Sequence, residues 1–303
     1  MSNALLLLPD FLLIVVGFVV CRYTALNRPV WDAAERLVYY LLFPVLLFNS
    51  IVKSPLQPAQ TLSLAAAGVG TVACGIVLAL AVKRWPGVDA RLHASGAQTV
   101  FRFNSFIALA LAERLGGPQG LAWMALIIAL CVPLCNVAAV WPLAQHGGHS
   151  YGRELLRNPL ILSTVAGLIA NLIGLKFPEA VATTLQRIGL AALPVGLMAV
   201  GAGLRLGGLK ASPALAATFL TLRHAVLPAT AIGLTAALAL GAEQRLIVVL
   251  FASLPTASSA YVLAARMGGD GAFVAGLVTV STLLGMISVP VWLAVLSALG
   301  PGL

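Results

Sequence analysis

The chain has 303 residues, of which 60% are apolar and 9% charged, and its mean hydropathy is +1.02. A water-soluble domain carries about 25% charged residues, so this composition cannot cover a surface that faces water. It excludes a soluble enzyme, a disordered chain and a disulfide-stabilised secreted domain. The net charge of +9 would suggest a nucleic-acid partner in a soluble protein. In a membrane protein the same excess marks cytoplasmic loops, so we expect a polytopic membrane protein and no nucleic acid.

Apolar runs bounded by charged residues, Pro or Gly divide the chain into ten expected membrane helices. This number fits the length, since a helix and its connection take about 30 residues. No soluble domain fits between them, and the longest polar connection runs from about Gln145 to Arg157. In chain order the expected spans are 3–22, 34–53, 60–82, 91–115, 118–144, 157–174, 180–205, 213–239, 243–266 and 270–296.

Lys and Arg are unequally divided between alternate connections. Because cytoplasmic connections carry the excess, we expect both termini outside and residues 145–156 inside. The richer side has eleven: Arg22, Arg28, Arg36, Lys83, Arg84, Arg91, Arg153, Arg157, Arg205, Lys210 and Arg266. The other side has five, namely Lys53, Arg114, Lys176, Arg187 and Arg245, and two of the 18 lie deep inside spans, namely Arg102 and Arg223.

Two blocks of residues recur in the same order at nearly one spacing. The sequence therefore predicts a first repeat at 1–144, a short connection at 145–156 and a second repeat at 157–303. Each repeat has five spans, and an odd number inserts the second copy upside down, as in secondary transporters. After 150 residues Pro9, Gly17 and Pro44 recur as Pro159, Gly167 and Pro194, and after 152 residues 111–117 recur as 263–269.

Spans 4 and 9 are expected to be interrupted near the middle of the membrane. In span 9, Pro255 lies among small hydroxylated residues, and a Pro at mid-span frees a backbone carbonyl. The offset of 152 makes Asn104 of span 4 the equivalent of Thr256. Interrupted helices of inverted repeats hold substrates, so we predict substrate contacts here. The predicted contacts are Asn104, Pro255, Thr256, Ser258, Ser259 and Tyr261. The alternatives are an ordinary Pro kink in span 9 and, for Asn104, an amide that only packs between helices.

Two arginines lie far inside expected spans. Arg102 is 11 residues into span 4 and Arg223 is 10 residues into span 8, or ~17 Å and ~15 Å along a helix. A charge in the bilayer core costs several kcal/mol unless it faces a polar cavity, so each is a candidate substrate contact. The alternatives are snorkelling or a bond to carbonyls at a helix break. None of the nine acidic residues lies at mid-span, and Asp10 comes closest. The charge sign therefore favours an anionic substrate.

Weaker signals accompany these residues. Asn136 in span 5 is a further candidate for the substrate pathway, or else joins neighbouring helices. For His224, beside Arg223, a structural role is favoured over a substrate contact. His146 and His149 have no third ligand nearby, and the four cysteines lie in apolar stretches without ligand spacing. We therefore expect no metal site.

Several segments together resemble the auxin efflux carrier family, within the bile-acid/arsenite/riboflavin transporter superfamily. The resemblance extends over essentially the whole chain and depends on the order and spacing of these segments. The short central connection resembles that of bacterial malonate or malate permease-like members. The segments are Leu8-Pro9 with Gly17, residues 40–48 (YLLFPVLLF), Phe101-Arg102-Phe103-Asn104 with Gly116-Gly117, Asn158-Pro159, Ala192-Leu193-Pro194 with Gly201-Ala202, and Leu254-Pro255.

The resemblance implies ten helices, with broken spans 4 and 9 that cross near the midplane. It also implies a scaffold of spans 1, 2, 6 and 7 and a mobile transport domain of spans 3–5 and 8–10. Plant members bind the auxin carboxylate on an Asn at the span 4 crossing, which Asn104 matches. Those members carry Pro before that Asn, where this chain has Phe103, so the sharpness of the break in span 4 stays open.

We therefore expect a secondary active transporter of a small organic anion, working by elevator-type alternating access in a bacterial cytoplasmic membrane. A carrier of a larger auxin-like or bile-acid-like acid is one alternative, and a receptor or channel is another. No enzyme is expected, because the spans contain no Ser/His/Asp set, HExxH or aspartyl pair. We expect no cofactor, and the candidate coupling ions are H⁺ and Na⁺. The expected partners are a small carboxylate substrate and the lipid bilayer, and a homodimer through the scaffold helices stays open.

The Lys and Arg bias makes a testable prediction about topology. In a background without native cysteines, Ser2→Cys should react with a membrane-impermeant maleimide added to intact cells. Ser150→Cys should react only in inside-out vesicles, because the bias places it in the cytoplasm. Reaction of both cysteines in intact cells would contradict the arrangement of five plus five inverted spans.

Overall fold

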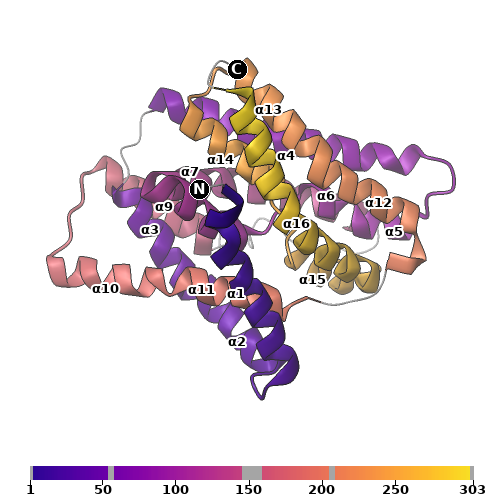
Figure 1. Cartoon of the computed structure of the whole chain (residues 1–303), viewed down its shortest axis with the longest axis horizontal. Helices are drawn as coiled ribbons and strands as arrows, with labels where there is room; N and C mark the ends of the chain where they lie inside the picture. Colours follow the sequence, from indigo (N-terminus) through magenta and orange to yellow (C-terminus); the bar gives the residue numbers. More distant parts are fainter. Residues whose placement is uncertain (1–2, 54–57, 145–158, 205–208, 301–303) are drawn as a thin grey trace. The chain divides into compact units, whose positions relative to one another are not determined.

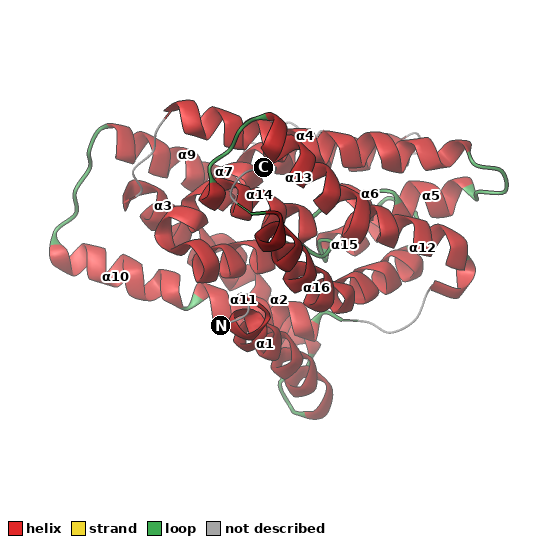
Figure 2. Ribbon diagram, turned by 45° about the horizontal axis from the view of Figure 1, so that its top comes forward, coloured by secondary structure: helices red, strands yellow, loops and turns green. Residues whose placement is uncertain are grey.

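The computed structural model describes residues 3–53, 58–144, 159–204 and 209–300, and this part of the chain folds into helices and connections without a strand (Figure 2). A helix pairs its own backbone N–H and C=O groups, which hydrocarbon requires of any segment that crosses it. The expected all-α class is therefore confirmed.

Six helical stretches among the described residues are long and apolar enough to cross a membrane. The longest covers most of expected spans 4 and 5 and bends at Gly117, whose φ is 57°. A multi-pass membrane protein is shown, whereas the layout of ten helices in two inverted repeats stays a prediction. The six stretches are Arg28–Lys53, Leu62–Arg84, Ala90–Val140, Glu179–Ala202, Pro213–Ala237 and Gly271–Leu299.

The chain divides into two compact units, each built from separate segments. Unit 1 comprises the described parts of 1–61, 109–129 and 150–203, and unit 2 those of 62–108, 130–149 and 204–303. The predicted domains, namely the two repeats and the scaffold and transport groups of spans, stay predictions.

Unit 1 contains two closely packed helix pairs, α1 with α11 and α3 with α9 (Figure 1). In the first pair glycines remove the side chains that would keep the backbones apart. A methyl group at Gly17 would overlap the Met198 carbonyl, and one at Gly201 would overlap the Ile14 carbonyl. The helices of this unit are α1 (Asn3–Tyr23), α2 (Arg28–Leu37), α3 (Phe43–Lys53), the middle of α7 (Ser105–Ala144), α9 (Pro159–Leu172), α10 (Glu179–Leu190) and α11 (Ala192–Ala202).

The two pairs are equivalent under the offset of 150. Adding 150 to the bounds of α1 gives 153–173, which covers α9, and subtracting 150 from those of α11 gives 42–52, which overlaps α3. Gly167 of α9 faces the Phe48 carbonyl and Ile51 as Gly17 of α1 faces Met198. Both copies of the repeated Gly therefore lie where helices approach closely.

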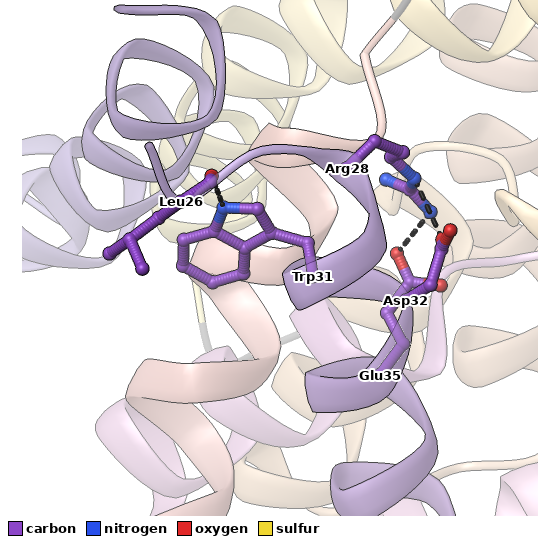
Figure 3. A network of polar contacts seen from close by, with 5 residues as sticks. All are labelled: Leu26, Arg28, Trp31, Asp32 and Glu35. Carbon is purple, nitrogen blue, oxygen red and sulfur yellow. Dashed lines mark hydrogen bonds and ion pairs between the residues drawn. The ribbon is translucent and has the colours of Figure 1, made fainter. Parts of the chain in front are cut away.

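Polar contacts stabilise the corner between α1 and α2 (Figure 3). Arg28 Nε lies 2.8 Å from Asp32 Oδ1, and Arg28 Nη2 lies 2.8 Å from Glu35 Oε1. Trp31 Nε1 donates to the Leu26 carbonyl at 2.9 Å. Because its ring packs on Ala199 and Ala202 of α11, Trp31 also attaches α2 to the closely packed pair.

Unit 2 contains the helices that the sequence predicts to be interrupted. Expected span 4 is non-helical from Arg102 to Asn104, and expected span 9 from Leu254 to Ser258. The helices are α4 (Pro58–Ala81, from residue 62), α5 (Ala90–Gly96), α6 (Gln98–Phe101), both ends of α7 (Ser105–Ala144), α12 (Pro213–Thr221), α13 (Leu227–Ala237), α14 (Ala242–Ser253), α15 (Ser259–Arg266) and α16 (Gly271–Leu299).

A wide π-helical turn joins α12 to α13, and the sequence explains its place. Pro228 has no N–H, and its ring would clash with the carbonyl of His224 in an α-helix. The turn Leu222–Val226 widens so that Leu227 N donates to Leu222 O, and the freed His224 carbonyl accepts from Trp292 Nε1 at 2.7 Å. Single π turns in helices often mark functional sites, and this one carries Arg223.

The close approach of α1 and α11 predicts a strong effect of one methyl group. Gly17→Ala should destabilise the protein by about 1–3 kcal/mol, because the backbones must separate to accommodate it. Gly233→Ala is the matched control, since a Cβ there meets nothing within 4 Å and Ala favours an exposed helical site. Thermal unfolding in detergent measures both variants. Equal melting temperatures for the two would contradict the packing described for α1 and α11.

Candidate functional site

The two interrupted segments bind each other directly. Asn104 N donates to Pro255 O at 2.9 Å, and Thr256 Oγ1 donates to Arg102 O at 3.0 Å. In an unbroken helix Asn104 N would donate to Val100 O, four residues earlier. Each break thus supplies partners for backbone groups of the other, which low-dielectric surroundings require.

Asn104 explains how the first break forms without the Pro of plant members. Its Oδ1 accepts from Phe106 N at 3.0 Å and from Ile107 N at 3.2 Å. A side-chain oxygen in this position is an N-cap, which satisfies two of the free N–H groups of the new helix. Phe103, in place of Pro, packs edge-on against Phe251 with ring centroids 4.6 Å apart. The break in span 4 therefore depends on a cap and on tertiary contacts.

The beginnings of α7 and α15 give this region a positive electrostatic character. The N-terminal end of a helix carries about half a positive charge. Arg102 precedes α7 by three residues, and its Nη2 donates to Ser259 Oγ, at the start of α15, at 3.0 Å. Its Nη1 is buried and finds no partner among the described residues. Arg102 is half-buried and Ser259 is exposed, so a donor with unused capacity lies close to an accessible hydroxyl.

Arg223 meets the opposite ends of the interrupted helices. Its Nε donates to Leu254 O at 2.6 Å and its Nη1 to Val100 O at 3.2 Å. Val100 lies in the last turn of α6 and Leu254 directly after α14, and carbonyls at such helix ends carry partial negative charge. The side chain is only 2% exposed. This geometry corresponds to the alternative stated for Arg223 from the sequence, a bond to carbonyls at a helix break.

His224 connects the second break to α16. One ring nitrogen, Nε2, lies 2.8 Å from Ser281 Oγ, and the other, Nδ1, lies 2.8 Å from Ser288 Oγ. Ser281 Oγ also accepts from Thr256 N at 2.9 Å. The imidazole thus fixes the hydroxyl that satisfies the backbone of the break.

The remaining predicted residues lie around this centre. Pro255 is buried against α16, where Gly285 leaves room for its ring, and Ser258 is half-buried before α15. Tyr261 packs against the apolar cluster of α15 and α16 that contains Ala260 and Val274. Asn136 is half-buried on α7, next to Cys135. The structure therefore brings Arg102, Asn104, Pro255, Thr256 and Ser259 into direct contact and places Tyr261 in a packing environment.

Two participants were missed by sequence reasoning. Ser281 satisfies Thr256 N, and Cys135 donates its thiol to Phe101 O at 3.3 Å, a carbonyl that an unbroken helix would have used. Ser281 lies 25 residues from its partner and Cys135 lies 34 from its own. Apolar helices contain many Ser and Cys residues, and no local pattern separates these two from the others.

Acidic side chains lie away from the interruptions in the described part of unit 2. Asp89 and Asp270 cap the beginnings of α5 and α16, and Glu243 lies in the first turn of α14. Asp10, in unit 1, is paired with Arg114 at 3.2 Å. No group of three potential metal ligands occurs among the described residues, and His146 and His149 lie outside them.

Comparison with known proteins identifies a family. A family model described as "Membrane transport protein" matches residues 148–293. The matched stretch includes the second interruption, Arg223, His224 and Ser281. No curated protein matches the chain.

The role of Ser281 gives a prediction about stability. Ser281→Ala removes the acceptor of Thr256 N and should cost about 1–3 kcal/mol, because a buried N–H is left without a partner. Ser253→Ala is the control, since Ser253 is equally buried but its hydroxyl only donates to Val249 O within its own helix. Thermal unfolding should show a larger loss for Ser281→Ala. The same loss for both would mean that the Thr256 backbone finds another partner.

Proposed function

Because this chain belongs to the auxin efflux carrier family of membrane transporters, we propose that it is a secondary active transporter of a small organic anion of the malonate or malate type. The observation that carries the proposal is the guanidinium of Arg102, which has a buried and unpartnered Nη1 beside the beginnings of two helices. The guanidinium and the two helix beginnings together favour a carboxylate as the substrate group bound here.

The chemistry of the donors supports an anion. Arg102 offers charged N–H groups, and the accessible Ser259 and half-buried Ser258 offer hydroxyls. Asn104 uses its oxygen for the cap, so its amide nitrogen is the part of that side chain that can donate to a ligand. Charge-assisted hydrogen bonds to a carboxylate are about twice as strong as neutral ones. Pro255 shapes the site through its backbone carbonyl, and Thr256 through its backbone N–H and its hydroxyl.

The transport cycle proposed here is elevator-type alternating access. The interrupted helices carry the anion, and their movement against the scaffold exposes it first to one side of the membrane and then to the other. Partial charges of helix ends are fixed in the backbone, so they hold the carboxylate without a mobile counter-ion. We further propose a bacterial cytoplasmic membrane with both termini outside, and H⁺ or Na⁺ as candidate coupling ions.

The proposal predicts an ordered loss of malonate affinity in variants of Arg102. Arg102→Lys keeps the charge but loses the planar pair of donors, whereas Arg102→Gln loses both. Arg102→Lys should therefore weaken binding less than Arg102→Gln, for which about tenfold or more is expected from a lost hydrogen bond of roughly 1–3 kcal/mol. Malonate-dependent thermal shifts and counterflow in proteoliposomes measure affinity and transport on monodisperse protein.

Asn104→Asp provides a variant that separates folding from binding. An Asp oxygen caps a helix as well as an Asn oxygen, so the melting temperature should stay close to that of the wild type. The added negative charge should abolish malonate binding. Wild-type affinity in Asn104→Asp and in both Arg102 variants would overturn this site. A response to larger aromatic acids in place of malonate would favour that alternative substrate class, and uptake without counterflow would indicate a channel.

A further inference from the structure

The interruptions of the two helices leave backbone carbonyls that need a positive partner. Leu254 O would accept from Ser258 N, and Val100 O from Asn104 N, if the helices continued. Both breaks remove these donors, and Asn104 N turns to Pro255 O. Two partly negative helix ends are thus brought together in the interior of unit 2.

Helix-end and unwound carbonyls of this kind are what transporters with interrupted helices use to coordinate a monovalent cation. Here the same acceptors receive Nε and Nη1 of Arg223, at 2.6 Å and 3.2 Å. The third nitrogen, Nη2, is buried and has no partner among the described residues. The guanidinium therefore lies where a cation ligated by these carbonyls would have to lie.

The other described groups around Arg223 do not neutralise its positive charge, which therefore faces the carbonyls of Leu254 and Val100. On its own turn lies His224, whose two nitrogens bond Ser281 and Ser288 of α16. From α7 comes Cys135, whose thiol is engaged with Phe101 O. The acidic side chains of the described part of unit 2, Asp89, Glu243 and Asp270, lie at helix beginnings. The field of the two helix ends is thus the main counter-charge of this arginine.

We propose that Arg223 is a resident cation of the crossing, which replaces a bound Na⁺ or K⁺ at the carbonyls of Leu254 and Val100. The inference rests on the proposed transport function and deepens it. Arg223 is then a positioning residue, which holds the two interrupted segments together so that Arg102 and Asn104 face the substrate. The crossing has no place left for an exchangeable metal cation, and substrate binding does not require one, so of the two candidate coupling ions this inference favours H⁺ over Na⁺.

The proposal is tested first on the wild type by replacing Na⁺ and K⁺ with choline. The melting temperature, measured without substrate, and malonate counterflow should both stay unchanged. Arg223→Ala should lower the melting temperature by roughly 5–10 °C, since two charge-assisted hydrogen bonds are lost. Millimolar guanidinium, which fits the vacated space, should restore a large part of that loss. Na⁺ should give a smaller recovery, and choline should give none.

Gly17→Ala is the matched control, because it destabilises the protein through packing and removes no charge. Its melting temperature should not respond to guanidinium or Na⁺ in preference to choline. A wild-type melting temperature or counterflow that rises with Na⁺ would overturn the proposal, as would an Arg223→Ala variant that no small cation stabilises more than choline does. Should Arg223→Ala fail to fold, Arg223→Lys and the uncharged Arg223→Gln replace it. The lysine variant should melt at the higher temperature, because its ammonium still supplies a cation to the two carbonyls, and equal melting temperatures would overturn the proposal. Because the melting temperatures are measured without substrate, a failure of malonate as substrate would leave this result intact.

Discussion

The need to satisfy the backbone wherever a helix stops is the constraint on which unit 2 depends. Each break removes helical hydrogen bonds in apolar surroundings, where an unpaired N–H or C=O costs several kcal/mol. The chain replaces them with contacts between distant segments: Asn104 N with Pro255 O, Thr256 Oγ1 with Arg102 O and Arg223 with two carbonyls. Each break thus depends on the other segment or on Arg223 for partners of its freed backbone groups.

The direction of the helix dipoles then separates the functions of the two arginines. The beginnings of α7 and α15 are positive, and Arg102 adds a guanidinium with unused donors near them. The ends of α6 and α14 are negative and receive Arg223. Equal charges thus have different surroundings: the guanidinium of Arg102 keeps an unused donor, and that of Arg223 neutralises two helix ends. In the proposed carrier, this arrangement would concentrate positive potential at the substrate site while the helix ends stay paired.

Unit 1 uses a different physical device. Its helices α1 and α11 are continuous where they meet, and they come close because Gly17 and Gly201 have no side chains. Small residues at such contacts increase van der Waals packing, which replaces the hydrophobic driving force between helices in lipid. At the corner of α1 and α2, Arg28 forms ion pairs with both Asp32 and Glu35. A unit packed by backbone contact is suited to remain rigid, as the proposed scaffold requires.

The sequence by itself determined the membrane class, the all-helical fold, the repeated glycines and prolines, the family resemblance and the interruption of span 9 at Pro255. Each follows from composition, periodicity, spacing along the chain or Pro chemistry. The place of the interruption in span 4 is predicted from the offset of 152 residues that relates Asn104 to Thr256. It made both Arg102 and Arg223 candidate substrate contacts because both lie at similar depth in apolar spans, with Arg102 preferred for its place two residues from Asn104, and it left the sharpness of the break at Phe103 open. Only the tertiary structure decided these points. The partners of Arg223 lie 31 and 123 residues away and that of Arg102 lies 157 away, and no local pattern encodes which freed carbonyl a distant guanidinium will meet.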